Sequence, residues 1–319
     1  MASTILAAFL QFSRPEVATG SAGMAVLLIG TWAAKNDIAR ARGLDKIAAL
    51  TNLCFAIPLA VFGAEHLSMA QSIMNLVPRY MPWRLFWAYF VGCALIAASL
   101  SIAAKIAVRW SALLFGIMMF LFVAMIHFPG ALATVHVLDI FDRRVSPQER
   151  ISLTIVFREM SFGGAGWILA GSVINGWRAP VKTALLTVGR ILVALAAILF
   201  GAEHFLHPLG LPGVPLLKEM PGWIPGRALI DYVTGAALLA AGASFLLSRK
   251  TRAVATCVGG WILLLVLVIY GPVLILALYD PAIPVQVEGI NYFADTLLFA
   301  AAILAVASAA SRSDSKPAS

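Results

Sequence analysis

The chain has 319 residues, of which 61% are hydrophobic and 12% are charged, and its mean hydropathy is +0.92. Soluble domains carry roughly 25% charged residues, so this composition excludes an ordinary water-soluble fold. The formal net charge is +8, but no basic patch alternates with aromatic residues, and we therefore expect no nucleic-acid partner. The apolar runs are continuous, as in residues 261–278, which predicts helices that span a lipid bilayer rather than a β-barrel.

Nine apolar runs are candidates for membrane-spanning helices, because about 20 apolar residues are needed to cross the hydrocarbon core. The first run is short and modestly apolar, so the sequence leaves open whether it crosses the membrane. The small, polar tail after residue 310 is expected to be disordered. The predicted spans are residues 17–34, 47–66, 85–104, 110–128, 153–174, 185–204, 228–247, 255–279 and 291–310.

The last eight predicted spans form two sets of four that indicate an internal duplication. The string Phe-Gly-Ala-Glu-His occurs at 62–66 and again at 200–204, a spacing of 138. Further matches in Pro, Gly and Arg follow at a spacing of 143, such as Arg84 with Arg227, and in the last span the spacing falls to 136. The sequence thus predicts an all-α transmembrane bundle with an N-terminal segment at 1–46, four-helix repeats at 47–174 and 175–310, and a tail at 311–319.

The loops predict how the chain lies in the membrane. Each repeat has an even number of spans, so both repeats share one orientation. Basic residues gather on one side, in the loop at 35–46 and in two tight turns, whereas the loop at 280–290 has none. The positive-inside rule places the basic side and the C-terminus in the cytoplasm of a bacterial inner membrane. The turn residues in question are Lys105, Arg109, Arg249 and Arg252.

Ionisable residues gather at the opposite, outer ends of the predicted helices. Such groups are costly near hydrocarbon and usually face a bundle interior or a wet cavity. The alternative is that they lie at the headgroup boundary, where they cap helices or pair with arginines. We expect the first and fourth helices of each repeat to be neighbours, with their carboxylates within roughly 10 Å. The candidate site residues are Glu65, His66, His127 and Glu159, then Glu203, His204, Tyr270 and Asp295, with His207 as a further candidate.

Other polar residues bear on the chemistry of this site. Adjacent residues such as Glu65 and His66 diverge by roughly 100° around a helix, and no motif brings four ligands together, so no metal is firmly predicted. Asp231 has an alanine as its repeat counterpart, so alanine at Glu65 and Glu203 is expected to impair activity more than alanine at Asp231. Arg190 is expected to extend to the cytoplasmic boundary or to pair with an acid. The three cysteines are expected to pack as small apolar residues.

Several of these strings resemble DoxX-like bacterial membrane proteins over residues 47–310. They are the two Phe-Gly-Ala-Glu-His strings, the segments 81–84 and 224–227, and the closing segment 291–298. Typical members have one four-helix unit, so this chain resembles two fused units. DoxD-type relatives are subunits of a thiosulfate:quinone oxidoreductase, and the resemblance implies a membrane component of a quinone-linked redox system, with quinone as cofactor and a redox partner protein. It supplies no catalytic residues.

Two other functions remain open from the sequence. One is a transporter for a small solute with its path between the two repeats, since parallel repeats occur in transporters. The other is a non-catalytic assembly partner of a membrane enzyme.

Overall fold

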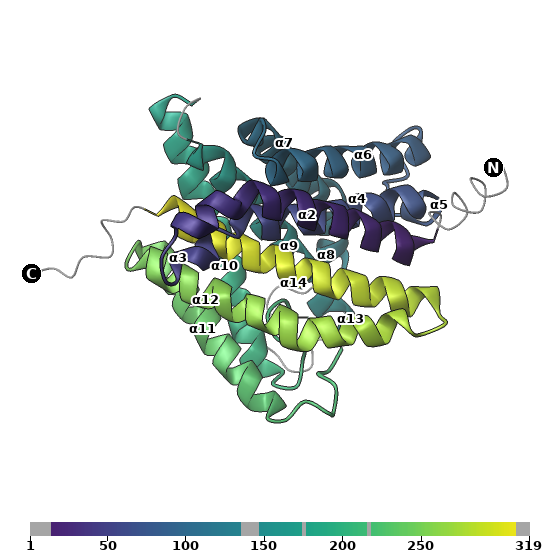
Figure 1. The fold of residues 1–319 in the computed structure, drawn as a ribbon. Coiled ribbons are helices and arrows are strands. Elements are labelled where there is room, and N and C mark those ends of the chain that lie inside the picture. The colour runs from purple at the N-terminus through teal and green to yellow at the C-terminus, as the bar shows by residue number, and fades with distance from the viewer. Residues whose placement is uncertain (1–13, 135–146, 174–176, 216–217, 311–319) are drawn as a thin grey trace, which may run out of the picture.

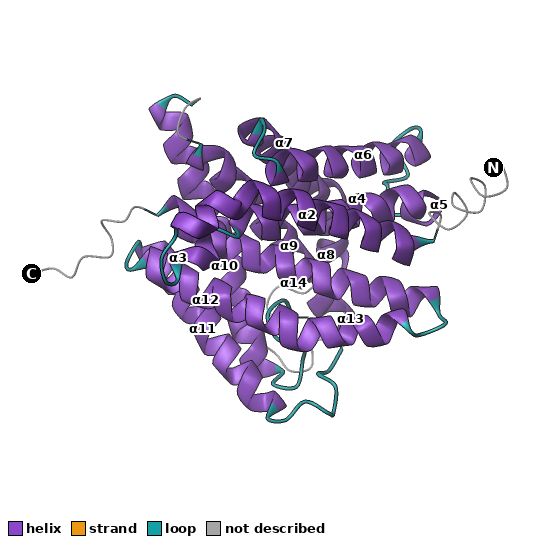
Figure 2. Ribbon diagram, viewed as in Figure 1, coloured by secondary structure: helices purple, strands orange, loops and turns teal. Residues whose placement is uncertain are grey.

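A computed structural model describes residues 14–134, 147–173, 177–215 and 218–310, and these residues fold as a bundle of helices without a β-strand (Figure 2). The predicted all-α class is confirmed. Eight helices are long and apolar enough to cross a membrane, including the one over the first predicted span, so the chain has the character of a multi-pass membrane protein. The predicted disordered tail lies outside the described residues.

The helices cover the predicted spans, but several extend well beyond the predicted limits, and α9 and α14 begin six and eight residues before the predicted positions 153 and 291. They are α2 (Pro15–Arg40), α3 (Asp45–Ala48), α4 (Thr51–Ser68), α5 (Ala70–Ile73), α6 (Arg84–Ala103), α7 (Val108–Phe122), the π-helical turn η1 (Val123–His127), α8 (Phe128–Thr134), α9 (Pro147–Ser172), α10 (Ala179–Leu206), α11 (Arg227–Leu247), α12 (Thr251–Leu265), the π-helical turn η3 (Val266–Tyr270), α13 (Gly271–Leu278) and α14 (Ile283–Ala309).

Helix α9 is the one predicted span that is not apolar enough to count among the eight. Arg158 and Glu159 lower its hydropathy, together with its serines and glycines. The other helices shield it, because it packs against α7, α10 and α14, and residues 161–166 are all buried. The contact with α10 is close: a methyl group added at Gly189 would overlap the carbonyl oxygen of Gly164. Small residues at such crossings let helix backbones approach each other in a membrane.

Helix α14 forms the centre of the bundle, between α4 on one side and α12 and α13 on the other (Figure 1). It also packs against α9, and residues 294–307 are buried without interruption. The expectation that the first and fourth helices of each set are close neighbours is wrong in the first set, where α4 and α9 share no extended contact in the described part of the chain. Instead α4 packs on α14 and α9 packs on α10, because α14 occupies the central position.

Several local features recur at the spacing of 143 seen in the sequence. The residues before α6 and α11, Trp83 and Gly226, both have a left-handed backbone conformation, and so do Ala107 and Lys250 before α7 and α12. The π-helical turns η1 and η3 also begin 143 residues apart, at Val123 and Val266. Because π turns are rare in helices, the match between η1 and η3 is informative about the relation between the two halves of the chain.

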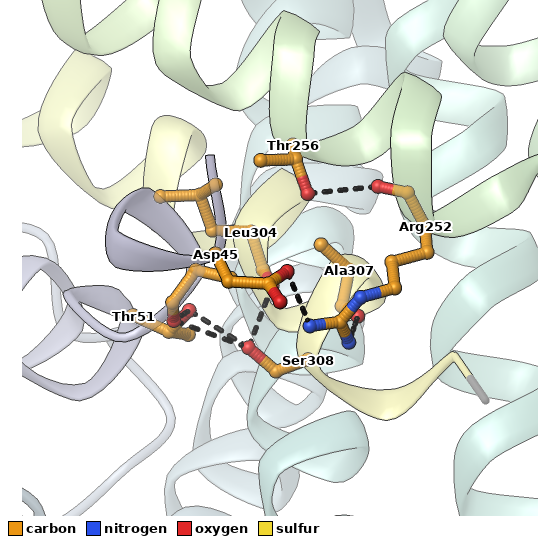
Figure 3. Close-up of polar contacts among 8 residues, drawn as sticks. Asp45, Thr51, Arg252, Thr256, Leu304, Ala307 and Ser308 are labelled. Atoms are coloured by element: carbon orange, nitrogen blue, oxygen red, sulfur yellow. Dashed lines mark hydrogen bonds and ion pairs between the residues drawn. The ribbon is translucent and has the colours of Figure 1, made fainter. Parts of the chain in front are cut away.

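Ionic and polar contacts hold several helix ends together at one end of the bundle, which we call the basic end (Figure 3). A nitrogen of Arg252 at the start of α12 lies 2.7 Å from a carboxylate oxygen of Asp45, and another donates to the carbonyl of Ala307 near the end of α14 at 3.1 Å. Thr51 and Ser308 are joined by a hydrogen bond of 3.0 Å. These contacts fix the start of α4, the start of α12 and the end of α14 at the same level.

Candidate functional site

An arginine near the middle of α9 connects acidic residues from two helices, and its partner Asp295 also lies near the middle of α14. The sequence expectation that Glu159 and Asp295 lie at the outer ends of their helices is therefore wrong, because both helices begin earlier than predicted. Arg158 donates to Asp295 on α14 at 2.5 Å and to its neighbour Glu159 at 3.1 Å. The three side chains are 18%, 6% and 12% exposed. Ion pairs of this kind are weakly screened by water, and the loss of one partner leaves an uncompensated charge in the interior.

Three further candidates surround this ion pair. Glu65 on α4 accepts a hydrogen bond of 3.3 Å from the side chain of Asn291 on α14, and its charge acts on Asp295. His66 and His127 both lie within electrostatic reach of Glu159. The group therefore brings together α4, η1, α9 and α14. We call it the Arg158 cluster: Glu65, His66, His127, Arg158, Glu159, Asn291 and Asp295.

The two histidines of the repeated strings, His66 and His204, differ in the hydrogen bonding of their Nε2 atoms. Nδ1 of His66 lies 2.8 Å from the carbonyl of Phe62, and Nδ1 of His204 lies 2.5 Å from the carbonyl of Phe200. A carbonyl only accepts, so Nδ1 carries the proton in both rings. Nε2 of His204 accepts a hydrogen bond of 2.8 Å from the amide of Gly213, so this ring is neutral. Nε2 of His66 has no hydrogen-bond partner within the described ranges.

A second group of ionisable residues surrounds His204, and we call it the His204 cluster: Glu203, His204, His207, Asp231 and Tyr270. A carboxylate oxygen of Asp231 on α11 lies 3.8 Å from Nε2 of His204, and Glu203 lies 3.9 Å from Nε2 of His207. The segment after α10 covers the cluster, since residues 211–215 are buried. Tyr270 of η3 holds this segment with a hydrogen bond of 2.8 Å to the carbonyl of Pro212.

Asp231 is fully buried, yet neither carboxylate oxygen accepts a well-formed hydrogen bond, although the backbone of Gly210 lies close to it. A cavity of about 10 Å³ lies between Asp231, His204 and Glu203, which is close to the space that one water molecule needs. A buried carboxyl group without donors is costly as an anion. The cluster therefore favours a neutral carboxyl group or an ordered water at this place.

The polar contacts in the structure do not follow the division into a first-repeat set and a second-repeat set that the sequence predicted. Asp295, predicted to belong with Glu203 and His204, forms its ion pair with Arg158 and joins the first-repeat residues. Tyr270 lies between the clusters, within electrostatic reach of Asp231 and of Asp295. This change follows from the central position of α14, which presents one face to α4 and α9 and another to η3.

Sequence reasoning placed three residues of these clusters outside the site. Arg158 was considered only under the alternative in which the acids pair with arginines, and such a pairing is what the structure shows. Asn291 was considered only as part of a family string, and Asp231 as a residue of minor weight. The sequence could have indicated Arg158 as a site residue, because it is a charged residue next to Glu159 inside an apolar run. Asp231 had a similar signal, because it is the only acid in α11, yet its missing counterpart in the first repeat hid its importance.

Comparison with known proteins adds no family to this description. No protein-family model matches the chain, and no curated protein or solved structure matches it. The resemblance to DoxX-like proteins therefore stays a prediction. Within the residues that the structure describes, no three His, Cys, Asp or Glu side chains are placed to hold a metal ion.

Proposed function

We propose that this membrane protein exchanges protons at the Arg158 cluster as the membrane component of a quinone-linked redox system. The observation that carries the proposal is the charge balance of the cluster. Two carboxyl groups, those of Glu159 and Asp295, pair with the one guanidinium group of Arg158, and a third, that of Glu65, acts on Asp295 and has only the side chain of Asn291 as donor. An excess of negative charge is costly there, so the cluster holds one or more protons that it can exchange.

His66 supplies a route for such a proton. Its Nδ1–H is fixed by the carbonyl of Phe62, while Nε2 keeps its lone pair within reach of the charge of Glu159. Histidine changes its charge near neutral pH and is therefore suited to relay protons. Reduction of a quinone consumes two electrons and two protons, so a membrane site that serves quinones needs such a relay. The redox partner protein would supply the electrons.

The proposal includes two four-helix repeats that share one orientation, with the basic end in the cytoplasm. The matched left-handed residues and the matched π turns support the repeats. The basic residues Lys105 and Arg249, both exposed at turns, support this orientation. In this arrangement Glu65 and His66 lie near the outer end of α4, where a quinone headgroup meets the membrane boundary, and Arg158 and Asp295 lie deeper, near the middle of α9 and α14.

The proposal is tested on protein purified in nanodiscs from quinone-containing membranes. Quinone is extracted and quantified, and protonated carboxyl groups are detected by their infrared C=O stretch. We expect co-purified quinone and a protonated-carboxyl band in the wild type, and loss of the band's pH dependence in Glu65→Gln. Asp37→Asn, which removes an exposed acid paired with Lys105, is the matched control and should leave both signals unchanged. A wild-type protein with neither quinone nor a protonated-carboxyl band would rule out the proposal.

A further inference from the structure

A second polar site lies at the basic end, well separated from the clusters described above. It is a pocket of about 180 Å³ between α9, α10, α12 and α14. Its walls combine apolar side chains, among them Ile168, Leu186 and Val306, with the polar side chains of Thr187, Arg190 and Thr251. Ile168 and Arg158 are ten residues apart on α9, about 15 Å along the helix, and the close contact of Gly164 with Gly189 lies between them.

Arg190 contributes a positive charge to this pocket. The sequence predicted that Arg190 extends to the cytoplasmic boundary or pairs with an acid. The structure shows no acid: the side chain is half-buried, its Nε is fully buried without a hydrogen-bond partner, and it forms no ion pair with any described residue. A guanidinium group in such a place gains from an anion that offers oxygen acceptors, because planar N–H groups match phosphate and carboxylate geometry.

Thr251 contributes a second unused polar group from another helix. It is 3% exposed, and its hydroxyl oxygen is buried in the pocket lining without a hydrogen-bond partner. Thr251 is the first residue of α12, a helix of 15 residues whose N-terminus no side chain caps. The free amides of a helix N-terminus and the helix dipole both favour an anion. Two independent donors thus face the same space.

We propose that this pocket binds a phosphate group, carried by an anionic phospholipid. Arg190 and Thr251 would donate to the phosphate oxygens, and the apolar walls would contact the glycerol and acyl portion. The mixture of one cation, two hydroxyl groups and several apolar side chains favours an amphiphile over a small soluble anion, which would leave the apolar side chains without a partner. Arg252 joins the start of α12 to the end of α14 through the carbonyl of Ala307 and to α3 through Asp45 (Figure 3).

The test is native mass spectrometry of the full chain released from nanodiscs of phosphatidylglycerol or of phosphatidylcholine. We expect one retained phosphatidylglycerol in the wild type, with affinity reduced about tenfold in Arg190→Gln and less in Thr251→Val, as loss of one charge-assisted hydrogen bond implies. Arg249→Gln, an exposed charge at the same end and outside the pocket lining, is the control and should keep the lipid.

A parallel titration with inorganic phosphate separates the two sources of the group. Competition by millimolar phosphate that depends on Arg190 would keep the phosphate site and replace the lipid by a soluble anion. Equal lipid retention in Arg190→Gln and Arg249→Gln would overturn the site. If Arg190→Gln does not fold, Arg190→Lys keeps the charge and removes the planar donor group, and the same comparison is made with Arg249→Lys.

Discussion

The amide of Gly213 donates a hydrogen bond of 2.8 Å to Nε2 of His204, and this contact distinguishes His204 from its counterpart His66. It fixes His204 as a neutral ring that joins α10 to the loop over the His204 cluster. It also requires glycine at position 213, where φ is +110°. The same repeated string therefore supplies a structural histidine in one half and a histidine with an open nitrogen in the other.

Gly213→Ala should lower the free energy of unfolding by about 1–3 kcal/mol. The substitution strains the backbone and brings a methyl group within 3.2 Å of Thr296, so the hydrogen bond to His204 is weakened. The melting temperature in detergent measures the effect. Gly222→Ala is the control, because Gly222 has open space around it and should melt with the wild type.

His66→Gln should reduce quinone-linked turnover about 100-fold, which is the lower range for loss of a proton-transfer group. Its stability should change little, because Gln can still donate toward the carbonyl of Phe62. His204→Gln should do the opposite: the protein loses stability while turnover per folded molecule is kept. Turnover and melting temperature are measured on the same samples. Equal turnover losses in both variants would contradict the distinction between the two rings.

Replacement of Asp231 tests whether its buried carboxyl group lowers the stability of the protein, a question that the sequence expectation about activity did not address. The expected order, with Glu65 and Glu203 ahead of Asp231, rested on the missing counterpart of Asp231. The structure buries Asp231 against His204, so Asp231→Leu should be neutral or stabilising, because it removes an unsatisfied polar group. Denaturation in detergent checks the sign. A loss of several kcal/mol would show that the carboxyl group makes strong hydrogen bonds, for instance to water.

The ion pair of Arg158 is tested with a double-mutant cycle. Arg158→Gln alone should destabilise the protein by about 3–5 kcal/mol, because two buried carboxylates lose their counter-ion. Asp295→Asn in the same chain should restore part of the loss, and the non-additive part measures the pair. Thermal or denaturant unfolding of the four proteins gives the values. Simple additivity would show that the two groups do not interact.

Single cysteines at exposed positions test the orientation in intact cells, in a background without Cys54, Cys93 and Cys257. Cysteine at Lys105 or Arg249 should resist a membrane-impermeant thiol reagent, since both residues lie on the basic side. Arg109 and Arg252 share that side, but Arg252 is a poor site because it binds Asp45. Cysteine at Tyr80 or Tyr279, which are 72% and 84% exposed, should react. The reverse pattern would invert the topology.

The sequence by itself determined the helical class and the approximate positions of the helices. Continuous apolar runs about 20 residues long leave the backbone few alternatives in a bilayer, because every amide must find its partner within the segment. For the same reason α6, α11 and α14 begin or end within a few residues of the predicted limits. The sequence also singled out Glu65, His66, His127 and Glu159 as one group, and in the structure Glu159 pairs with Arg158 while both histidines lie within electrostatic reach of Glu159.

Only the tertiary structure decided how the helices pair and which polar groups face each other. Residue spacing records contacts within one helix, but helix packing depends on surfaces that come from distant parts of the chain. Helix α14 occupies the centre because its run of small and aliphatic residues lets α4, α9 and α12 approach it closely. That position carries Asp295 to Arg158 and leaves Asp231 to face His204. Neither pairing follows from periodicity or from the duplicated strings, since Arg158 and Asp295 lie 137 residues apart and Asp231 has no counterpart in the first repeat.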